Sequence, residues 1–234
     1  MKAEVLAELN AERAARRPVL VVTDLADGSQ RLVKAKDIPA DPASAELERQ
    51  LRMGKSGSIE VGEKKLFVTV HAPVARLVIT GAVHISQALA PMARMLDYDV
   101  TVIDPRTAFA SPERFPDIPV LAEWPDVALP PLNVDHYTAF VAVTHDPKID
   151  DPALAHALER DCFYIGALGS RKTHGRRLER LKQLGFSDEQ LARIHAPVGL
   201  NIGAVSPAEI AVSIIAEITH ELRGPKSNRK GPEA

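Results

Sequence analysis

From about residue 75 onward, the chain alternates short apolar runs with segments of helical spacing. Apolar runs of this length are typical of buried strands, and apolar residues that recur every three or four positions are typical of helices. The pattern predicts strands at residues 77–80, 100–103, 139–144 and 163–166 and helices at 85–96, 152–160, 171–184 and 206–222. Strands that alternate with helices predict an α/β fold with a doubly wound parallel sheet.

Local signals predict several ends of these elements. Gly185 follows the third helix, as expected of a glycine that ends a helix in the left-handed conformation. Ser187 and Ser206 are each followed within one turn by a glutamate or glutamine, which predicts a capped helix start. Seven prolines between residues 105 and 131 predict mostly loop there, with one short strand at 119–121.

The first 74 residues predict a small α+β region with less regular patterning. Its expected elements are a helix over residues 2–17, strands at 18–23 and 65–70, and a short helix at 43–52 before a glycine-serine segment at 54–58. We therefore expect three parts: a small N-terminal domain (1–74), a larger domain (75–222) and a charged, disordered tail (223–234).

Composition narrows the function classes. The net charge of −2 and a pI near 6.5 do not favour nucleic-acid binding. We expect no signal peptide, no membrane span and a cytoplasmic location, because charges interrupt every apolar run. The single cysteine, Cys162, excludes an internal disulfide and is expected to be a buried apolar residue. The histidines lack metal-ligand spacing, so no metal site is predicted.

The strongest chemical signal is the turn after the first strand of the larger domain. Gly81 follows this apolar strand and a helix begins within a few residues, as in a Rossmann-type dinucleotide-binding domain. Asp104 ends the next strand 23 residues later, where a carboxylate accepts hydrogen bonds from ribose hydroxyls. Val83 and Ser86 replace the second and third glycines of the motif, so a Rossmann fold without tight dinucleotide binding remains the alternative.

Arg106 places a guanidinium next to Asp104. It is suited to a 2′-phosphate, a base or a second phosphate, and an ion pair with Asp104 is the equal alternative.

Two further loops follow strands at the predicted ligand edge of the sheet. His145 lies after the strand at 139–144 and is the candidate acid/base residue, with a loop-capping histidine as the alternative. Gly169, Ser170 and Arg171 begin a helix after the next strand and are expected to form a second anion site, against the alternative of a capped helix with solvated charges.

Six motifs, in this order, are similar to the XdhC/CoxI family of maturation factors for molybdenum hydroxylases such as xanthine dehydrogenase and carbon monoxide dehydrogenase. They are Gly-Ala-Val-His-Ile-Ser-Gln-Ala-Leu-Ala (81–90), Val-Thr-Val-Ile-Asp-Pro-Arg (100–106), Phe-Ala-Ser-Pro-Glu-Arg-Phe-Pro (109–116), Thr-His-Asp (144–146), Tyr-Ile-Gly-Ala-Leu-Gly-Ser-Arg-Lys (164–172) and Arg-Ile-His-Ala-Pro-Val-Gly-Leu-Asn-Ile-Gly-Ala (193–204). The resemblance implies a protein, usually dimeric, that binds molybdenum cofactor, supports its sulfuration and delivers it to an apo-enzyme.

The chain also departs from that pattern. Val83 stands where the family usually has the second glycine, and the N-terminal Gly-Ser-x-Pro-Arg and Gly-Gly-Cys-x-Glu segments are absent from the sequence. It looks like a short, CoxF-like form of the family with a reduced N-terminal domain.

The leading hypothesis is an accessory factor, more likely non-catalytic than an enzyme, that holds molybdopterin, its cytosine dinucleotide or a regulatory nucleotide. The cofactor-binding residues are then expected in the loops named above: Gly81, Ala82, Val83, His84, Asp104, Arg106, His145, Gly169, Ser170 and Arg171. The expected partners are the large subunit of a molybdenum hydroxylase, other maturation factors and a second copy of the chain. An NAD(P)-dependent oxidoreductase and a ligand-free scaffold remain the rival hypotheses.

Overall fold

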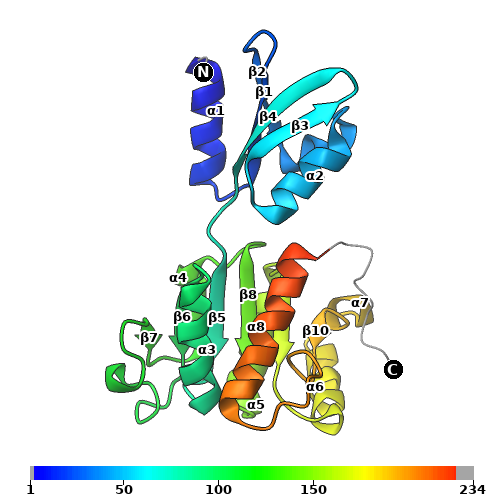
Figure 1. Cartoon of the computed structure of the whole chain (residues 1–234). Coiled ribbons are helices and arrows are strands. Elements are labelled where there is room, and N and C mark those ends of the chain that lie inside the picture. Colours follow the sequence, from blue (N-terminus) through cyan, green and yellow to red (C-terminus); the bar gives the residue numbers. More distant parts are fainter. Residues whose placement is uncertain (1–2, 225–234) are drawn as a thin grey trace. The chain divides into compact units, whose positions relative to one another are not determined.

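The computed structural model describes residues 3–224 (Figure 1). The chain divides between Pro73 and Val74 into two compact units, and each is described by itself. The predicted tail lies outside the described residues from position 225 onward. No helix within residues 3–224 is long and apolar enough to cross a membrane.

The first unit is a four-stranded antiparallel sheet with the strand order β2-β1-β4-β3. Its elements are α1 (Ala3–Ala14), β1 (Val19–Asp24), β2 (Gln30–Lys34), the 3-10 helix η1 (Ala35–Ala40), α2 (Ser44–Met53), β3 (Gly57–Val61) and β4 (Lys64–His71). Leu20 and Val22 of β1 pack with the apolar residues of α2 and η1 on one face of the sheet. Val19 and Val21 pack with Leu9 of α1 on the other face.

Two strands of this unit were not among the predicted elements. β3 begins inside the glycine-serine segment, and β2 lies in a polar stretch. In β3 only Ile59 is buried. A single buried side chain gives almost no alternation of apolar and polar positions, so the sequence signal for a strand is weak. Gly28 and Gly62 adopt positive φ angles in the turns that lead into the neighbouring strands, as hairpins of this kind require.

The second unit contains a six-stranded sheet in which all neighbouring strands are parallel. Its strands are β5 (Arg76–Thr80), β6 (Asp99–Ile103), β7 (Val120–Leu121), β8 (Thr138–Ala142), β9 (Tyr164–Ala167) and β10 (Ile194–His195). Their order, β10-β9-β8-β5-β6-β7, corresponds to 3-2-1-4-5-6 when the sheet is read from its β7 edge and the strands are counted from β5. This is the order of Rossmann-type dinucleotide-binding sheets, so the predicted fold class is confirmed.

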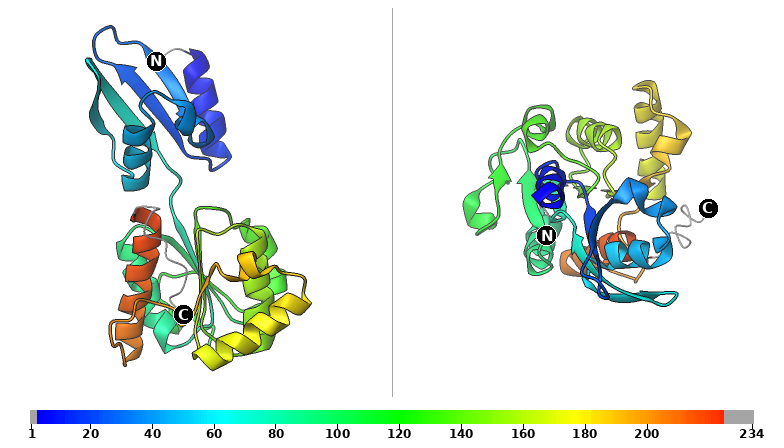
Figure 2. Two further views of the ribbon diagram at one scale, coloured as in Figure 1. Left: turned by 90° about the vertical axis from the view of Figure 1, so that its right-hand side faces the viewer. Right: turned by 90° about the horizontal axis from the view of Figure 1, so that it is seen from above.

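Helices cover both faces of this sheet (Figure 2, left). One face packs against α3 (His84–Met95) and α8 (Pro207–Arg223), and the other against α4 (Pro125–Leu132), α5 (Pro147–Glu159), α6 (Arg171–Gln183) and the short α7 (Asp188–Leu191). Side chains of the central strand alternate between the two cores: Leu77 and Ile79 join the first, and Val78 joins the second. Because of this alternation, the sheet lies between two apolar layers, one on each of its faces.

Several element ends differ from the prediction. α5 begins five residues early, because the Asp146 side chain caps it by accepting the N–H of Lys148 at 2.9 Å. α4 lies within the stretch predicted as mostly loop, because Pro125 occupies the first helical position, where its missing N–H is not needed. The predicted caps at Ser187 and Ser206 are confirmed as capping boxes.

Candidate functional site

The loops at the carboxyl edge of the second sheet diverge between β5 and β8. The chain after β5 leads to α3 on one face, whereas the chain after β8 leads to α5 on the opposite face. Open α/β sheets bind ligands in the crevice that forms at such a switch point. Every predicted site residue follows β5, β6, β8 or β9, so the topology brings all of them to this edge.

Gly81 turns the chain out of β5 in a conformation that only glycine adopts readily. Its φ is +113°, and a Cβ there would lie 2.8 Å from Thr144 Cγ2 and 3.1 Å from Val143 Cγ2. The turn therefore packs directly against the end of β8. A side chain is therefore excluded at position 81.

Val83 does not need to be glycine in this structure. Its backbone is extended (φ −103°, ψ 178°), and its side chain packs against the apolar cluster of the α3 face. Val83 is the N-cap of α3 and forms no side-chain cap, so the N–H groups of the first turn, beginning at His84, have no cap partner. Such N–H groups are the ones that bind anions at helix N-termini.

Ser86 replaces the third glycine of the motif with a bonded hydroxyl. Its side chain is fully buried, and Oγ donates a hydrogen bond to the Gly81 carbonyl. The hydroxyl therefore holds the turn against the first turn of α3.

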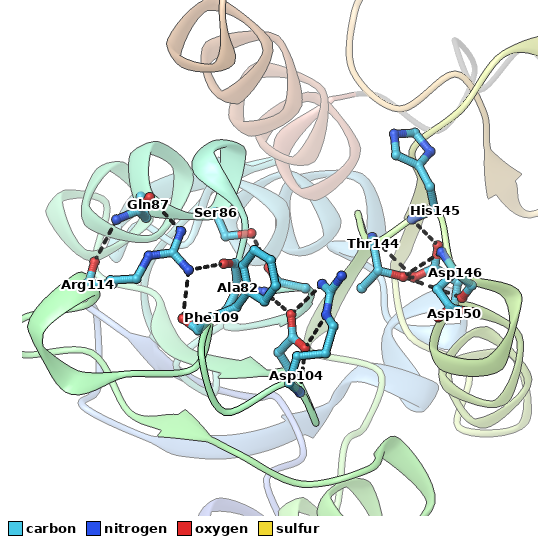
Figure 3. Close-up of polar contacts among 12 residues, drawn as sticks. Ala82, Ser86, Gln87, Asp104, Phe109, Arg114, Thr144, His145, Asp146 and Asp150 are labelled. Atoms are coloured by element: carbon cyan, nitrogen blue, oxygen red, sulfur yellow. Dashed lines mark hydrogen bonds and ion pairs between the residues drawn. The ribbon is translucent and has the colours of Figure 1, made fainter.

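Asp104 is a fully buried carboxylate whose two oxygens accept four hydrogen bonds (Figure 3). Oδ2 accepts from the Ala82 N–H at 2.8 Å and from Arg106 Nη2 at 2.7 Å. Oδ1 accepts from the Arg106 N–H at 3.0 Å and from Arg106 Nε at 2.9 Å. Burial raises the pKa of Asp104, but the hydrogen bonds from Arg106 and Ala82 outweigh it and hold the pKa below its usual value.

Arg106 forms the ion pair with Asp104 that was one of its two predicted roles. About a third of its side chain (35%) remains exposed. The Phe109 ring lies against the guanidinium, with 4.5 Å between Cζ and the ring centroid. The guanidinium is thus fixed by an acid at one edge and by an aromatic ring at one face.

Arg114 was not predicted, and it ties the segment after β6 to the glycine turn (Figure 3). Nη1 donates to the carbonyls of Ala82 and Phe109, both at 2.9 Å, and Nη2 donates to Gln87 Oε1 at 3.0 Å. Both polar groups of Ala82 are therefore bonded within the protein, and its N–H is not free for a ligand. The motif at 109–116 contains Arg114 and was the available signal.

His145 lies after β8 with a positive φ of +66°, which is uncommon for a residue with a side chain. Asp150, on α5, fixes this backbone: Oδ2 accepts the His145 N–H at 3.1 Å, and Oδ1 accepts the Thr144 hydroxyl at 2.6 Å. The residue is exposed, and its ring points away from Asp150 (Figure 3).

A buried ion pair connects this loop with the loop after β9. Arg177, on α6, is 2% exposed; its Nη2 lies 3.9 Å from Asp150 Oδ2 and donates to the Leu168 carbonyl at 2.8 Å. Nε and Nη1 of Arg177 are buried without a hydrogen-bond partner among the described residues. Burial raises the pKa of Asp150 and lowers the pKa of Arg177. Sequence patterns did not indicate either residue.

The loop after β9 leads into a capped helix, which was the alternative interpretation of its residues, and an anion site here stays a prediction. Gly169 has a φ of +133°, and Ser170 caps α6 by accepting the N–H of Thr173 at 3.2 Å. Arg171 is exposed in the first turn. A second cation is therefore accessible at the carboxyl edge of the sheet.

Glu217 of α8 fixes the loop that follows β10. Its carboxylate accepts from the Tyr164 hydroxyl and from the Gly199 N–H at 2.8 Å, and His195 Nδ1 lies 3.3 Å away. Burial raises the pKa of Glu217, but the bonds from His195 and Tyr164 outweigh it and leave the pKa lowered. The path of this glycine-containing loop is thus set partly by a half-buried carboxylate.

The structure also bears on two other kinds of chemistry, metal binding and reaction of the Cys162 thiol. The described part of the chain contains no group of three or more His, Cys, Asp or Glu side chains that could hold a metal ion. Cys162 is buried, as predicted, and burial raises the pKa of its thiol to about 12. A thiol of this kind stays protonated near neutral pH and is a poor nucleophile.

The strand order, the glycine turn and the helix N-termini at one edge define a Rossmann-type domain. The chain belongs to the XdhC Rossmann domain family, whose model matches residues 77–218. The matched stretch contains every crevice residue described above.

Three curated bacterial relatives are similar in sequence. The uncharacterized protein YqeB of Escherichia coli K12 is 36% identical over 71% of this chain and 32% of its own length. PaoD of the same organism, a molybdenum cofactor insertion chaperone, is 34% identical over 62% of this chain and 40% of its own length. A probable xanthine dehydrogenase subunit from Bacillus subtilis 168 is 31% identical over 65% of this chain and 44% of its own length. The matches thus span less than half of each relative.

A solved structure shares the fold. A crystal structure from Bacillus halodurans, described as a xanthine dehydrogenase, aligns with a TM-score of 0.64 and 23% identity over 97% of this chain and 66% of that one. At this identity the likeness concerns the fold alone.

Proposed function

We propose that this protein is an accessory factor in the maturation of a molybdenum hydroxylase of the xanthine dehydrogenase or carbon monoxide dehydrogenase type. It holds molybdenum cofactor, or a nucleotide that regulates its transfer, in the crevice between β5 and β8. The observation that carries the proposal is the family match over all crevice residues, together with the 34% identity to a molybdenum cofactor insertion chaperone.

The crevice residues fit a pterin that carries a phosphate group. Gly81 excludes side chains from the first turn, and the uncapped N–H groups at the start of α3 suit one phosphate. Arg106 and Arg171 supply exposed positive charge after β6 and β9. Such a ligand would bring the molybdenum itself, so the chain needs no metal site of its own.

The protonated, buried thiol of Cys162 argues against a role of this chain as the sulfur donor. Sulfuration of the cofactor needs a reactive sulfur carrier, and a buried thiol with a pKa of about 12 is unsuited to that chemistry. We therefore assign holding and insertion to this protein and place the sulfur donor on another maturation factor. Its proposed partners in the cytoplasm are this factor, the large subunit of the molybdenum enzyme and a second copy of the chain.

The amount of pterin that co-purifies with the protein tests the proposal. The protein is isolated from a host that makes molybdenum cofactor, and released pterin is oxidised and quantified by fluorescence. We expect close to one pterin per chain and a clear loss in Arg171→Ala, with no loss in Arg160→Ala, an exposed arginine at the C-terminal end of α5. Absence of pterin from the wild-type protein would contradict the proposal.

The NAD(P)-dependent oxidoreductase is the second candidate, because the strand order is that of dinucleotide-binding sheets. It predicts turnover of reduced nicotinamide cofactor that depends on His145. A protein that carries no pterin, but oxidises NADPH in a His145-dependent way, would favour this candidate. A protein that binds neither ligand would favour the scaffold.

A further inference from the structure

The carboxylate after β6 is saturated by this chain's own donors. In dinucleotide-binding folds the acid at this position accepts hydrogen bonds from ribose hydroxyls. A carboxylate offers about four acceptor sites. Asp104 already accepts four hydrogen bonds, and Arg106 supplies three of them. No acceptor site remains for a ribose diol.

Making room for a diol would require breaking the ion pair. Arg106 Nε and Nη2 would have to leave a carboxylate that has no exposed surface. Bidentate charge-assisted pairs are among the strongest hydrogen bonds in proteins, and a buried charge left without its partner is strongly unfavourable. Two neutral hydroxyls replace that charge poorly, so the geometry disfavours a free ribose diol here.

Arg106 itself remains available to an anion. Its side chain is 35% exposed, and Nη1 bonds to none of the described residues. The Phe109 ring, 4.5 Å away, fixes the guanidinium plane, and the guanidinium of Arg114 lies 5.5 Å from the centroid of the same ring. Two guanidinium groups around one exposed aromatic ring make this end of the crevice suited to a phosphate.

We propose that the crevice selects a phosphate monoester over a free ribose diol at the end of β6. Arg106 contacts the phosphate, and Asp104 is a positioning residue that holds Arg106 and the Ala82 peptide. This inference rests on the proposed function, because it names the group that the crevice ligand presents to this end. The phosphate can belong to a phosphorylated nucleotide or to a phosphorylated pterin.

Two matched ligand pairs test the inference by calorimetric titration of the full chain. The first pair is NADP and NAD, which differ by the 2′-phosphate. The second pair is the fluorescent oxidised pterin of molybdenum cofactor before and after enzymatic removal of its phosphate. We expect the phosphorylated member of at least one pair to bind about tenfold tighter or more, as one charge-assisted contact implies. The pair that shows the preference identifies the source of the phosphate.

Three variants test which residues cause the preference for the phosphorylated ligand. Arg106→Gln removes the charge but keeps a donor for Asp104, and is expected to reduce the affinity ratio to near one. Asp104→Asn should lower the ratio while leaving the affinity of the unphosphorylated member nearly unchanged; a merely structural role would weaken both members alike. Arg160→Ala is the control and should leave the ratio unchanged.

Equal affinities in both pairs, a preference for the unphosphorylated members or failure of all four ligands to bind at millimolar concentration would overturn the inference. A preference that persists in Arg106→Gln would overturn it as well. These results are distinguishable from failure of the proposed function, which shows as absence of co-purified pterin from the wild-type protein.

Discussion

Two aspartate–arginine pairs hold the two sides of the crevice, and they differ in exposure. Asp104 and Arg106 fix the glycine turn, with Arg106 bonded to the carboxylate at 2.7 and 2.9 Å and one third exposed. Asp150 and Arg177 fix the loops after β8 and β9, with 3.9 Å between their closest charged atoms and both residues almost fully buried.

The same pair of residue types thus serves two purposes. In each pair the aspartate accepts backbone N–H groups of a crevice loop: Ala82 in one, Thr144 and His145 in the other. Only the first pair presents a guanidinium to solvent. We infer that the Asp104 pair faces the ligand, whereas the Asp150 pair maintains the scaffold of the loops.

The largest effect is expected from Asp150→Ala. It removes the partner of the buried Arg177 guanidinium and leaves the N–H groups of Thr144 and His145 without their acceptor, so the free energy of unfolding should fall by about 3–5 kcal/mol. Urea denaturation at pH 7, followed by the fluorescence of Trp124, measures it in the second unit, which contains the sole tryptophan of the chain.

The control is Asp188→Ala, which removes an exposed ion pair with Lys182 and should change the free energy by less than about 1 kcal/mol. If the two substitutions lower the free energy of unfolding equally, the buried ion pair stabilises the fold no more than an exposed one.

Asp104→Ala should cost less, about 2 kcal/mol, measured in the same way. The Ala82 N–H loses its acceptor in a buried position, but Arg106 is exposed enough to become hydrated. A loss as large as that of Asp150→Ala would contradict the division between a ligand-facing pair and a scaffold pair.

The two aspartates should also give opposite dependences of the unfolding free energy on pH. The folded-state pKa of Asp104 is lowered, so its stabilisation is present above the usual aspartate pKa and is lost as the pH falls through the folded value. The folded-state pKa of Asp150 is raised, so the folded state binds the proton first, and the stability contributed by this group decreases as the pH rises from the usual value through the folded one.

Unfolding free energies of wild type, Asp104→Asn and Asp150→Asn between about pH 2 and pH 7 measure these slopes, because the Asp104 transition lies below the usual aspartate pKa and the Asp150 transition lies above it. The difference between wild type and variant should rise with pH for Asp104→Asn and fall with pH for Asp150→Asn. Slopes of the same sign would refute the assignment of opposite pKa shifts.

The smallest effect is expected from Arg114→Lys, at about 1 kcal/mol. A lysine can reach one of the three acceptors that Arg114 bonds, so the segment after β6 should be held less firmly to the glycine turn. Faster amide hydrogen exchange at residues 106–115, with unchanged exchange in α5 and α6, is the expected result. Loosened helices would instead indicate a general loss of stability.

The sequence predicted the fold of the second unit because its signals are local. Gly81 and Asp104 lie at the ends of apolar strands, and the main strands and helices are readable from a few neighbouring residues; the short β10 and the proline-rich α4 were missed. The two missed strands of the first unit had only sparse apolar residues, such as Ile59 in β3, and their place in the sheet depends on pairing with distant strands.

The site was predicted less completely, because its contacts join residues from separate loops. Asp150 and Arg177 lie 27 residues apart on different helices, and only the packing of α5 beside α6 brings them together. The ion pair of Arg106 with Asp104 was one of two open interpretations, and a choice between them required the side-chain geometry. Val83 illustrates the same point, since its effect on the turn depends on where its side chain packs.

Transfer of cofactor to a client enzyme tests the central claim most directly. The full chain, isolated with its bound pterin, is mixed with the apo form of a molybdenum hydroxylase from a strain that lacks this protein, and enzyme activity and protein-bound pterin are followed together. The account predicts that activity appears in proportion to the pterin that leaves this chain. Pterin that stays bound while the enzyme remains inactive, or a protein that carries none, would contradict it.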